Sequence, residues 1–268
     1  MSNNFNDIIS VLDAINKENT VQVYLPSFKK EVPFKSLTTG QQKLFLKSAI
    51  DNPVFQTRFI FAVYSVITEN CVDKQILPKL TVFDSISVLI QLRLKIHGEQ
   101  LEVTSENETY RVNLNEVVEK IKTIEIPVPD TIIDTPFSID VGVPTFADQY
   151  ALEKQLREKA LTDDQALNTN INDTLGEAFI GEISKYIKEV RVTSNGEEYN
   201  LNYNSLNFIK KHQVLEKIPS TVVKKIITYI EKITTLQKSI TTVQGAKLSD
   251  GTLKEVEVPI SSTLFAIE

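Results

Sequence analysis

The sequence predicts an α+β fold, and three observations support this class. Apolar residues recur at spacings of three and four in several segments, as expected for one face of a helix. Short runs alternate between apolar and polar residues around the turn dipeptides Asn195-Gly196 and Asp250-Gly251. The two patterns do not alternate regularly, as they would in a doubly wound fold. We therefore expect amphipathic helices with short β-hairpins in the first half, and a mainly helical second half with a C-terminal β-hairpin.

The first half begins with a helical pattern over residues 5–15 and an alternating pattern over residues 20–34, which predicts a hairpin that turns at Pro26 and Ser27. Thr38 and Gln41 have the spacing of a capping box, which indicates the start of a helix. The elements expected next are a helix over 55–67 after the break at Pro53, a helix over 81–94 that ends at Gly98, strands over 101–104 and 110–114, and a short helix capped by Asn115.

Residues 126–148 have a different composition, because four prolines lie among Val, Ile and Phe. Proline excludes a helix there, and the apolar content argues against disorder. We interpret this stretch as an extended segment pinned to a surface and as a domain boundary. The predicted organisation is a mixed α+β domain over 1–125, a proline-rich extended connector over 126–146, and a mainly helical domain with a terminal hairpin over 147–268.

The second half is expected to contain more helix than strand. The predicted elements are a polar helix over 147–161, an Asn/Asp-rich connection over 162–174, a helix over 175–190, a hairpin over 190–201, the longest helix over 220–239, and a closing strand over 256–260.

Composition excludes several classes of protein. The 268 residues include 29 basic and 35 acidic side chains, a net charge of −6 that argues against a nucleic-acid-binding face. A single cysteine cannot form an intramolecular disulfide, and with two histidines it makes a structural zinc site improbable. The densest apolar run, residues 59–67, is far shorter than the ~20 residues of a membrane-spanning helix. No basic, apolar secretion signal follows Met1.

The sequence contains no convincing catalytic motif. Neither a Gly-x-Ser-x-Gly nucleophile motif nor a glycine-rich phosphate loop occurs. Cys71 follows an apolar helix and is expected to be a packing residue. His97 precedes the glycine that ends a helix, where an imidazole can interact with the last carbonyls, so a metal-binding role is not expected for it. A metal-binding role is expected still less for His212, which follows two lysines.

The adjacent carboxylates Asp163-Asp164 and Glu197-Glu198 lie in predicted loops or turns, where their side chains diverge into solvent. The lysines of the helix over 220–239 lack interleaved aromatic residues, so a solvated face is favoured over a nucleic-acid surface. We expect no enzymatic activity, no cofactor, no metal site and no small-molecule substrate.

Two stretches carry a specific family pattern. The first contains Leu25-Pro26-Ser27, then a short strand with an aromatic residue, and reaches Gln41. The second runs from Leu80-Thr81 through Asp84 and Leu92-Arg93-Leu94 to Gly98-Glu99. Together they resemble the T4-type phage baseplate hub family. Some relatives end in a hairpin with paired cysteines, which the hairpin over 242–260 lacks, so no metal is expected there.

The resemblance implies a structural or assembly component of the central hub of a contractile tail baseplate. The expected partners are other hub or tail proteins, with homo-oligomerisation possible and without nucleic acid or a membrane span. The expected location is the virion tail baseplate, after assembly in the host cytoplasm.

Three alternatives remain open at this stage. The protein could be a transient hub assembly chaperone that is absent from the virion. It could be a cell-wall hydrolase of the hub, for which Glu69, near the end of an apolar helix, is the best available acid. It could also be a host-side cytosolic adaptor.

The proline-rich segment is the predicted docking site, because extended apolar backbone can add to the sheet edge of a partner. The predicted partner-binding residues are Pro127, Val128, Pro129, Ile132, Ile133, Pro136, Phe137 and Pro144.

Overall fold

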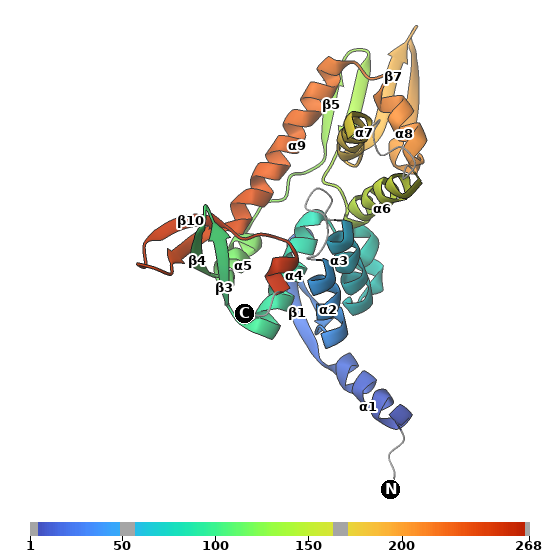
Figure 1. Cartoon of the computed structure of the whole chain (residues 1–268). Coiled ribbons are helices and arrows are strands. Elements are labelled where there is room, and N and C mark those ends of the chain that lie inside the picture. Colours follow the sequence, from blue (N-terminus) through green and yellow to red (C-terminus); the bar gives the residue numbers. More distant parts are fainter. Residues whose placement is uncertain (1–4, 49–56, 163–170, 266–268) are drawn as a thin grey trace. The chain divides into compact units, whose positions relative to one another are not determined.

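The computed structural model describes residues 5–48, 57–162 and 171–265, and these belong to two units. Unit 1 contains Met1–Glu125 together with Lys238–Glu268, and unit 2 contains Ile126–Gln237. Figure 1 shows that each unit combines helices with an antiparallel sheet. The α+β class is therefore confirmed.

Unit 1 begins with helix α1 and a two-stranded hairpin. The elements of this part are α1 (Phe5–Glu18), β1 (Thr20–Leu25), β2 (Lys30–Lys35), α2 (Thr39–Ser48), α3 (Thr57–Asn70), η1 (Lys74–Lys79) and α4 (Val82–His97). Strand β1 pairs with β2 from Thr20↔Lys35 to Leu25↔Lys30, and α4 packs against β1. Alternate residues of both strands, Val23, Leu25, Val32 and Phe34, are buried.

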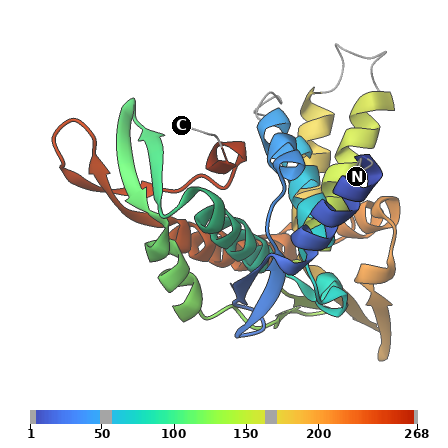
Figure 2. The same cartoon turned by 90° about the horizontal axis from the view of Figure 1, so that it is seen from below.

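A four-stranded sheet completes unit 1, and it joins residues from both ends of the chain. Its strands, in the order β10-β9-β4-β3, are β10 (Leu253–Glu257), β9 (Thr242–Lys247), β4 (Glu108–Asn113) and β3 (Gln100–Ser105), with α5 (Leu114–Thr123) following β4. Strand β9 pairs with β4, for example through Val112↔Gly245. Figure 2 shows the red C-terminal hairpin beside the green β3–β4 hairpin.

Gly245 is required at the centre of this sheet. A Cβ at that position would lie 3.0 Å from Tyr110 Cβ and 3.0 Å from Val256 Cγ2, closer than carbon atoms normally approach. The chain then ends its described part in a short helix, η3 (Ser262–Phe265), which returns to α2. There Phe265 stacks on Phe45, with ring centroids 4.2 Å apart and an interplanar angle of 10°.

Unit 2 is built on a second four-stranded antiparallel sheet, in the order β5-β6-β7-β8. Its elements are β5 (Asp130–Asp134), β6 (Phe137–Val141), α6 (Phe146–Thr162), α7 (Ile171–Ser184), β7 (Ile187–Ser194), β8 (Glu197–Asn202), η2 (Tyr203–Ser205), α8 (Phe208–Leu215) and α9 (Ser220–Thr241, the last four residues of which belong to unit 1). Ile132, Ile139 and Val190 are register partners on one face, and all three are buried.

Several local predictions are confirmed. Thr38 and Gln41 form a capping box, since each backbone amide donates to the other side chain at 3.1 and 3.3 Å. The turn at Asn195 and Gly196 has positive φ at both residues (54° and 82°), as a type I′ turn requires. The hairpin over residues 20–34, the helix that ends at Gly98 and the longest helix, α9, are also present.

Three expectations need correction. The second half is not mainly helical, because strands β7 to β10 all lie within residues 147–268. The helix expected over 175–190 ends at Ser184, since Ile187 and Val190 pair with Val141 and Ile139 in the sheet. The cap of α5 is Asn113, whose side chain accepts from the amide of residue 115.

Some expectations lie outside the described residues, namely the break at Pro53, the pair Asp163-Asp164 and most of the connection over 162–174. The division into domains 1–125, 126–146 and 147–268 stays a prediction. In the structure, residues 238–268 belong to unit 1 because β9 pairs with β4, and residues 130–141 supply two strands of the unit 2 sheet.

Candidate partner-binding surfaces

The two stretches that carry the family pattern meet at a buried carboxylate. Asp84, which is fully buried, accepts hydrogen bonds from the Ser27 backbone amide (3.1 Å) and from the Ser27 hydroxyl. It also accepts from the backbone amide (2.7 Å) and the hydroxyl (2.8 Å) of Thr81, which completes the capping box of α4. The Leu25-Pro26-Ser27 turn is therefore fixed to the N-terminus of α4, where a negative charge is favoured.

Arg93 makes a second set of contacts within the same pattern. Its side chain is almost fully buried, and its guanidinium donates to the carbonyls of Gly98 (3.1 Å), Gln100 (3.2 Å) and Leu264 (2.8 Å). One planar cation thereby joins the end of α4, the start of β3 and the C-terminal helix η3. The bond from Arg93 to the Gly98 carbonyl joins two parts of the family pattern, Leu92-Arg93-Leu94 and Gly98-Glu99. Arg93 and Gly98 therefore have a structural role.

The structure divides the predicted docking residues between the interior and the surface. Ile132 and Pro144 are buried, so they contribute to the core of unit 2. Val128 and Ile133 expose 79% and 68% of their surface. Pro129 and Pro136 are exposed as well, whereas Pro127 and Phe137 are partly exposed.

The segment over residues 130–141 is a hairpin rather than one extended strand. Strand β5 lies at an edge of the sheet and has β6 as its neighbour. Helix α9 contacts β5 through Lys225, whose ammonium group donates to the carbonyl of Ile133 (3.1 Å) and pairs with Asp134 (3.2 Å). Part of this sheet edge is therefore already occupied by α9.

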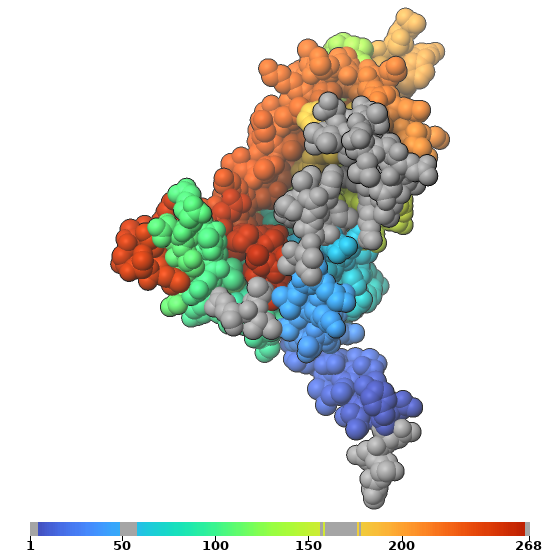
Figure 3. All heavy atoms as spheres, in the orientation of Figure 1, coloured from blue at the N-terminus to red at the C-terminus, as the bar shows by residue number. Residues whose placement is uncertain are grey.

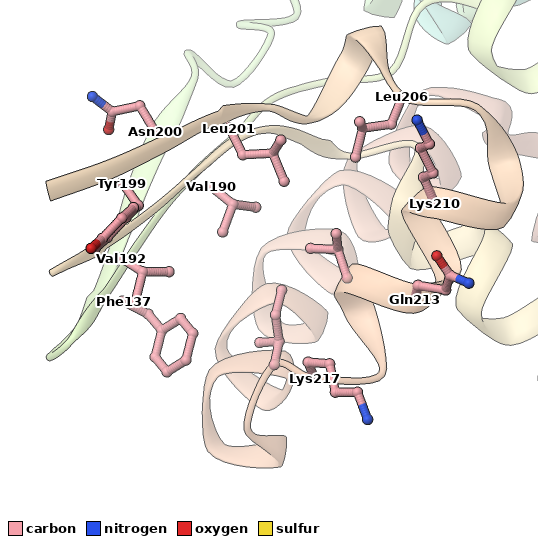
Figure 4. Close-up of a pocket in the computed structure, with 12 residues that line it drawn as sticks. Phe137, Val190, Val192, Tyr199, Asn200, Leu201, Leu206, Lys210, Gln213 and Lys217 are labelled. Atoms are coloured by element: carbon pink, nitrogen blue, oxygen red, sulfur yellow. The ribbon is translucent and has the colours of Figure 1, made fainter. Parts of the chain in front are cut away.

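An apolar groove with a volume of about 670 Å³ lies between strands β6 to β8 of the same sheet and helix α8. Figure 4 shows side chains of β6, β7 and β8 on one side and those of α8 and the following turn on the other. The lining residues are Phe137, Val190, Val192, Tyr199, Asn200, Leu201, Leu206, Lys210, Gln213, Val214, Lys217 and Ile218. Phe137 is the one predicted docking residue among them.

The charged residues that line this groove are all basic. Lys210 and Lys217 are its charged lining residues, and no carboxylate lines it among the residues that the structure describes. Both lysines are exposed, so they form a basic rim above an apolar floor. Such a surface suits an amphipathic segment that has carboxylates beside its apolar side.

Tyr203 holds the helical wall of the groove in place. It is fully buried, and its hydroxyl donates to the Lys211 carbonyl of α8 at 2.9 Å. Burial raises the pKa of this phenol to about 12, so it remains a neutral donor under physiological conditions. The groove was not predicted from the sequence, although Val190, Val192, Tyr199 and Leu201 alternate along the predicted hairpin and mark one apolar face.

The residues considered for chemistry do not form a catalytic arrangement in the described part of the chain. Cys71 is fully buried, and burial raises the pKa of its thiol. His212 lies against the ring of Phe208, with centroids 4.1 Å apart. No group of three or more His, Cys, Asp or Glu side chains among the described residues could hold a metal ion.

Glu69 has surroundings that differ from those of a general acid in a glycosidase. Its carboxylate is exposed, and it accepts hydrogen bonds from Gln41 Nε2 (3.0 Å) and Ser65 Oγ (2.7 Å). These surroundings are polar and open to solvent, whereas the acid of a glycosidase lies in an apolar pocket. Glu69 instead helps to join α2 to α3, because Gln41 also donates to Asn70 (2.8 Å).

The described part of the chain thus combines packed cores with apolar surfaces that remain exposed. A family model described as T4 bacteriophage base plate protein matches residues 17–254. Because this match covers most of the chain, the protein belongs to the T4 bacteriophage base plate protein family. No curated protein and no solved structure was found to match the chain.

Family membership confirms the resemblance at the level of the baseplate. The chain is a phage baseplate protein of the virion tail, and its family implies binding to other baseplate proteins. Among the described helices, none is long and apolar enough to cross a membrane.

Proposed function

We propose that the protein is a non-catalytic component of the central hub of a contractile phage tail baseplate. The observation that supports this proposal is the pair of hub-type sequence stretches, residues 25–41 and 80–99. The two stretches contact each other in unit 1, because Asp84 accepts hydrogen bonds from the amide and the hydroxyl of Ser27.

We further propose that the protein is a permanent hub subunit assembled in the host cytoplasm. Mass spectrometry of purified, DNA-filled virions tests this point, and stoichiometric peptides of the chain are expected. A hub subassembly isolated from the same virions should contain them too. Absence from virions, together with presence in assembling tails, would identify a transient hub assembly chaperone and contradict the subunit proposal.

The exposed residues of the proline-rich segment are the proposed contacts with neighbouring hub or tail proteins. Val128 and Ile133 present apolar surface to solvent, and Ile133 lies in β5, which pairs with β6. Of the other predicted docking residues, Ile132 and Pro144 are buried in unit 2 and Phe137 lines the groove. Exposed apolar side chains on and just before an edge strand suit protein–protein binding.

Substitution of single residues tests this surface without removing strands from the sheet. Val128→Glu and Ile133→Glu should each reduce the amount of tail protein that co-purifies with the chain. Leu253→Glu is the matched control, because Leu253 is exposed to almost the same extent (69%) but lies in unit 1. Undiminished co-purification in both unit 2 variants would remove this segment from the proposed interface.

A further inference from the structure

Helix α1 is an amphipathic helix with no buried residue. Its large apolar side chains expose between 42% and 73% of their surface, and they are Phe5, Ile8, Ile9, Val11, Leu12 and Ile15. Phe5, Ile8, Leu12 and Ile15 follow the 3-4-3 spacing of residues that pack against another element. Figure 3 shows the blue helix standing out from the rest of unit 1.

The apolar stripe of α1 needs a partner for physical reasons. A helix of 14 residues has marginal stability in water by itself, because the cost of nucleation is recovered mainly through packing. Almost all of α1 precedes the residues that match the family model, so the helix is an addition to the part that defines the family.

The charge of α1 restricts what can cover it. Asp7, Asp13 and Glu18 outweigh Lys17, which gives the helix a net charge of −2. Two α1 helices packed side by side would therefore bring like charges together. A basic surface with an apolar floor is a better complement.

The groove of unit 2 has these properties. Its floor contains Val190, Leu201 and Val214, and its charged lining residues are Lys210 and Lys217. Its volume of about 670 Å³ can accept several large apolar side chains. The stripe of α1 and the groove are thus opposite in charge, and both are apolar.

We propose that α1 of one copy docks into the unit 2 groove of a second copy. The two surfaces differ, so the contact is heterologous: each copy can offer its helix to one neighbour and its groove to another. Such contacts lead to a closed ring or to an open chain, depending on the rotation between copies. This self-association goes beyond the binding of other baseplate proteins.

The test measures the mass of the full-length protein by size-exclusion chromatography with light scattering over a wide concentration range. The wild-type chain should associate as its concentration rises. Leu12→Glu in α1 and Val214→Glu in the groove should each weaken association on the order of a hundredfold, because each buries an ionised carboxylate. Ile209→Glu is the control, since Ile209 is 66% exposed on α8 but does not line the groove.

Mixing the two variants distinguishes a heterologous contact from other modes. A Leu12→Glu copy retains its groove and a Val214→Glu copy retains its helix, so the mixture should form a 1:1 dimer that cannot grow further. A wild-type chain that stays monomeric would overturn the proposal. Association lost through Leu12→Glu but retained with Val214→Glu would also overturn it, because α1 would then bind a surface other than the groove.

Charge reversal gives a readout that does not depend on burying a carboxylate. Lys210→Glu combined with Lys217→Glu should weaken association, and adding Asp7→Lys and Asp13→Lys in the same chain should restore it. Wild-type association should also weaken as salt is added. Equal association of all these variants, each with an unchanged circular dichroism spectrum, would contradict the proposed pairing of charges.

Discussion

The backbone amide of Ser27 donates a hydrogen bond to Asp84 Oδ1 at 3.1 Å, which joins the β1–β2 turn to the first turn of α4. The carboxylate has no exposed surface, and the amide and hydroxyl of Thr81 donate to it as well. Buried donors of this kind are costly to leave without an acceptor. Asp84 is therefore the residue on which the joint between hairpin and helix depends.

Asp84→Ala should lower the free energy of unfolding by about 3 kcal/mol, because it leaves several buried donors without their acceptor. Ser27→Ala should cost only about 1 kcal/mol, since the backbone amide of residue 27 still donates to Asp84. Urea unfolding followed by circular dichroism measures both values, and Asp13→Ala on the exposed face of α1 serves as the control. Equal effects of Asp84→Ala and Asp13→Ala would contradict this role.

Arg93→Lys should destabilise the protein by about 2 kcal/mol although the charge is retained. A lysine ammonium cannot reproduce the planar set of donors that reaches the carbonyls of Gly98, Gln100 and Leu264. Hydrogen exchange should show increased opening at the start of β3 and in η3. Unchanged exchange at both places would argue against Arg93 as the link between them.

Phe265→Ala should cost about 3–4 kcal/mol, because the ring is fully buried and stacks on Phe45. Phe5→Ala is the matched comparison, since the Phe5 ring is 73% exposed and should contribute little to folding. The midpoints of urea unfolding provide the measurement. Similar midpoints for the two variants would show that η3 contributes little to the core of unit 1.

Cys71 should react slowly with an aromatic disulfide reagent at pH 8 in the folded protein. Burial raises the pKa of its thiol, so the fraction of reactive thiolate is below that of an exposed cysteine at the same pH. The raised pKa also favours folding below the ordinary thiol pKa, and this contribution is lost as the pH rises above it. Full reaction in urea is the reference, Cys71→Ala is the blank, and rapid labelling without urea would contradict the burial.

The purified protein should not release fragments from isolated bacterial cell wall. Glu69 is exposed and hydrogen-bonded to Gln41 and Ser65, whereas the acid of a glycosidase lies in an apolar pocket. Assays with the wild-type chain and with Glu69→Gln make the comparison. Cell-wall lysis by the wild-type chain that disappears in Glu69→Gln would establish the hydrolase alternative.

The sequence correctly predicted several helix caps and turns, because these depend on residues that are close together in the chain. The capping boxes at Thr38 and Thr81 and the turn at Asn195 and Gly196 involve residues three or fewer apart, so their geometry follows from the order of side chains. The structure of the segment after Ser184 was harder to predict from the sequence. Ile183 and Ile187 have a helical spacing, but the residues that follow Ile187 also fit a strand. Pairing with β6 decides in favour of the strand.

Contacts between distant residues could not be predicted in this way. Nothing near Val243 or Gly245 in the sequence specifies β4 as their neighbour, although the missing side chain of Gly245 allows the close approach. The groove also depends on how α8 lies across the sheet, a position fixed in part by the hydroxyl of Tyr203. The proline-rich segment was identified as extended, but its pairing as β5 and β6 required the strands of residues 187–202.

The interruption of unit 1 by unit 2 has a consequence for synthesis on the ribosome. Residues 20–123 emerge early, yet β9, β10 and the Phe265 ring that complete their sheet and core are the last described parts to be made. All of unit 2 is translated before them. A product released before β9 is made would therefore keep the surfaces of unit 2 while unit 1 stayed incomplete, so a complete unit 1 requires translation through Phe265.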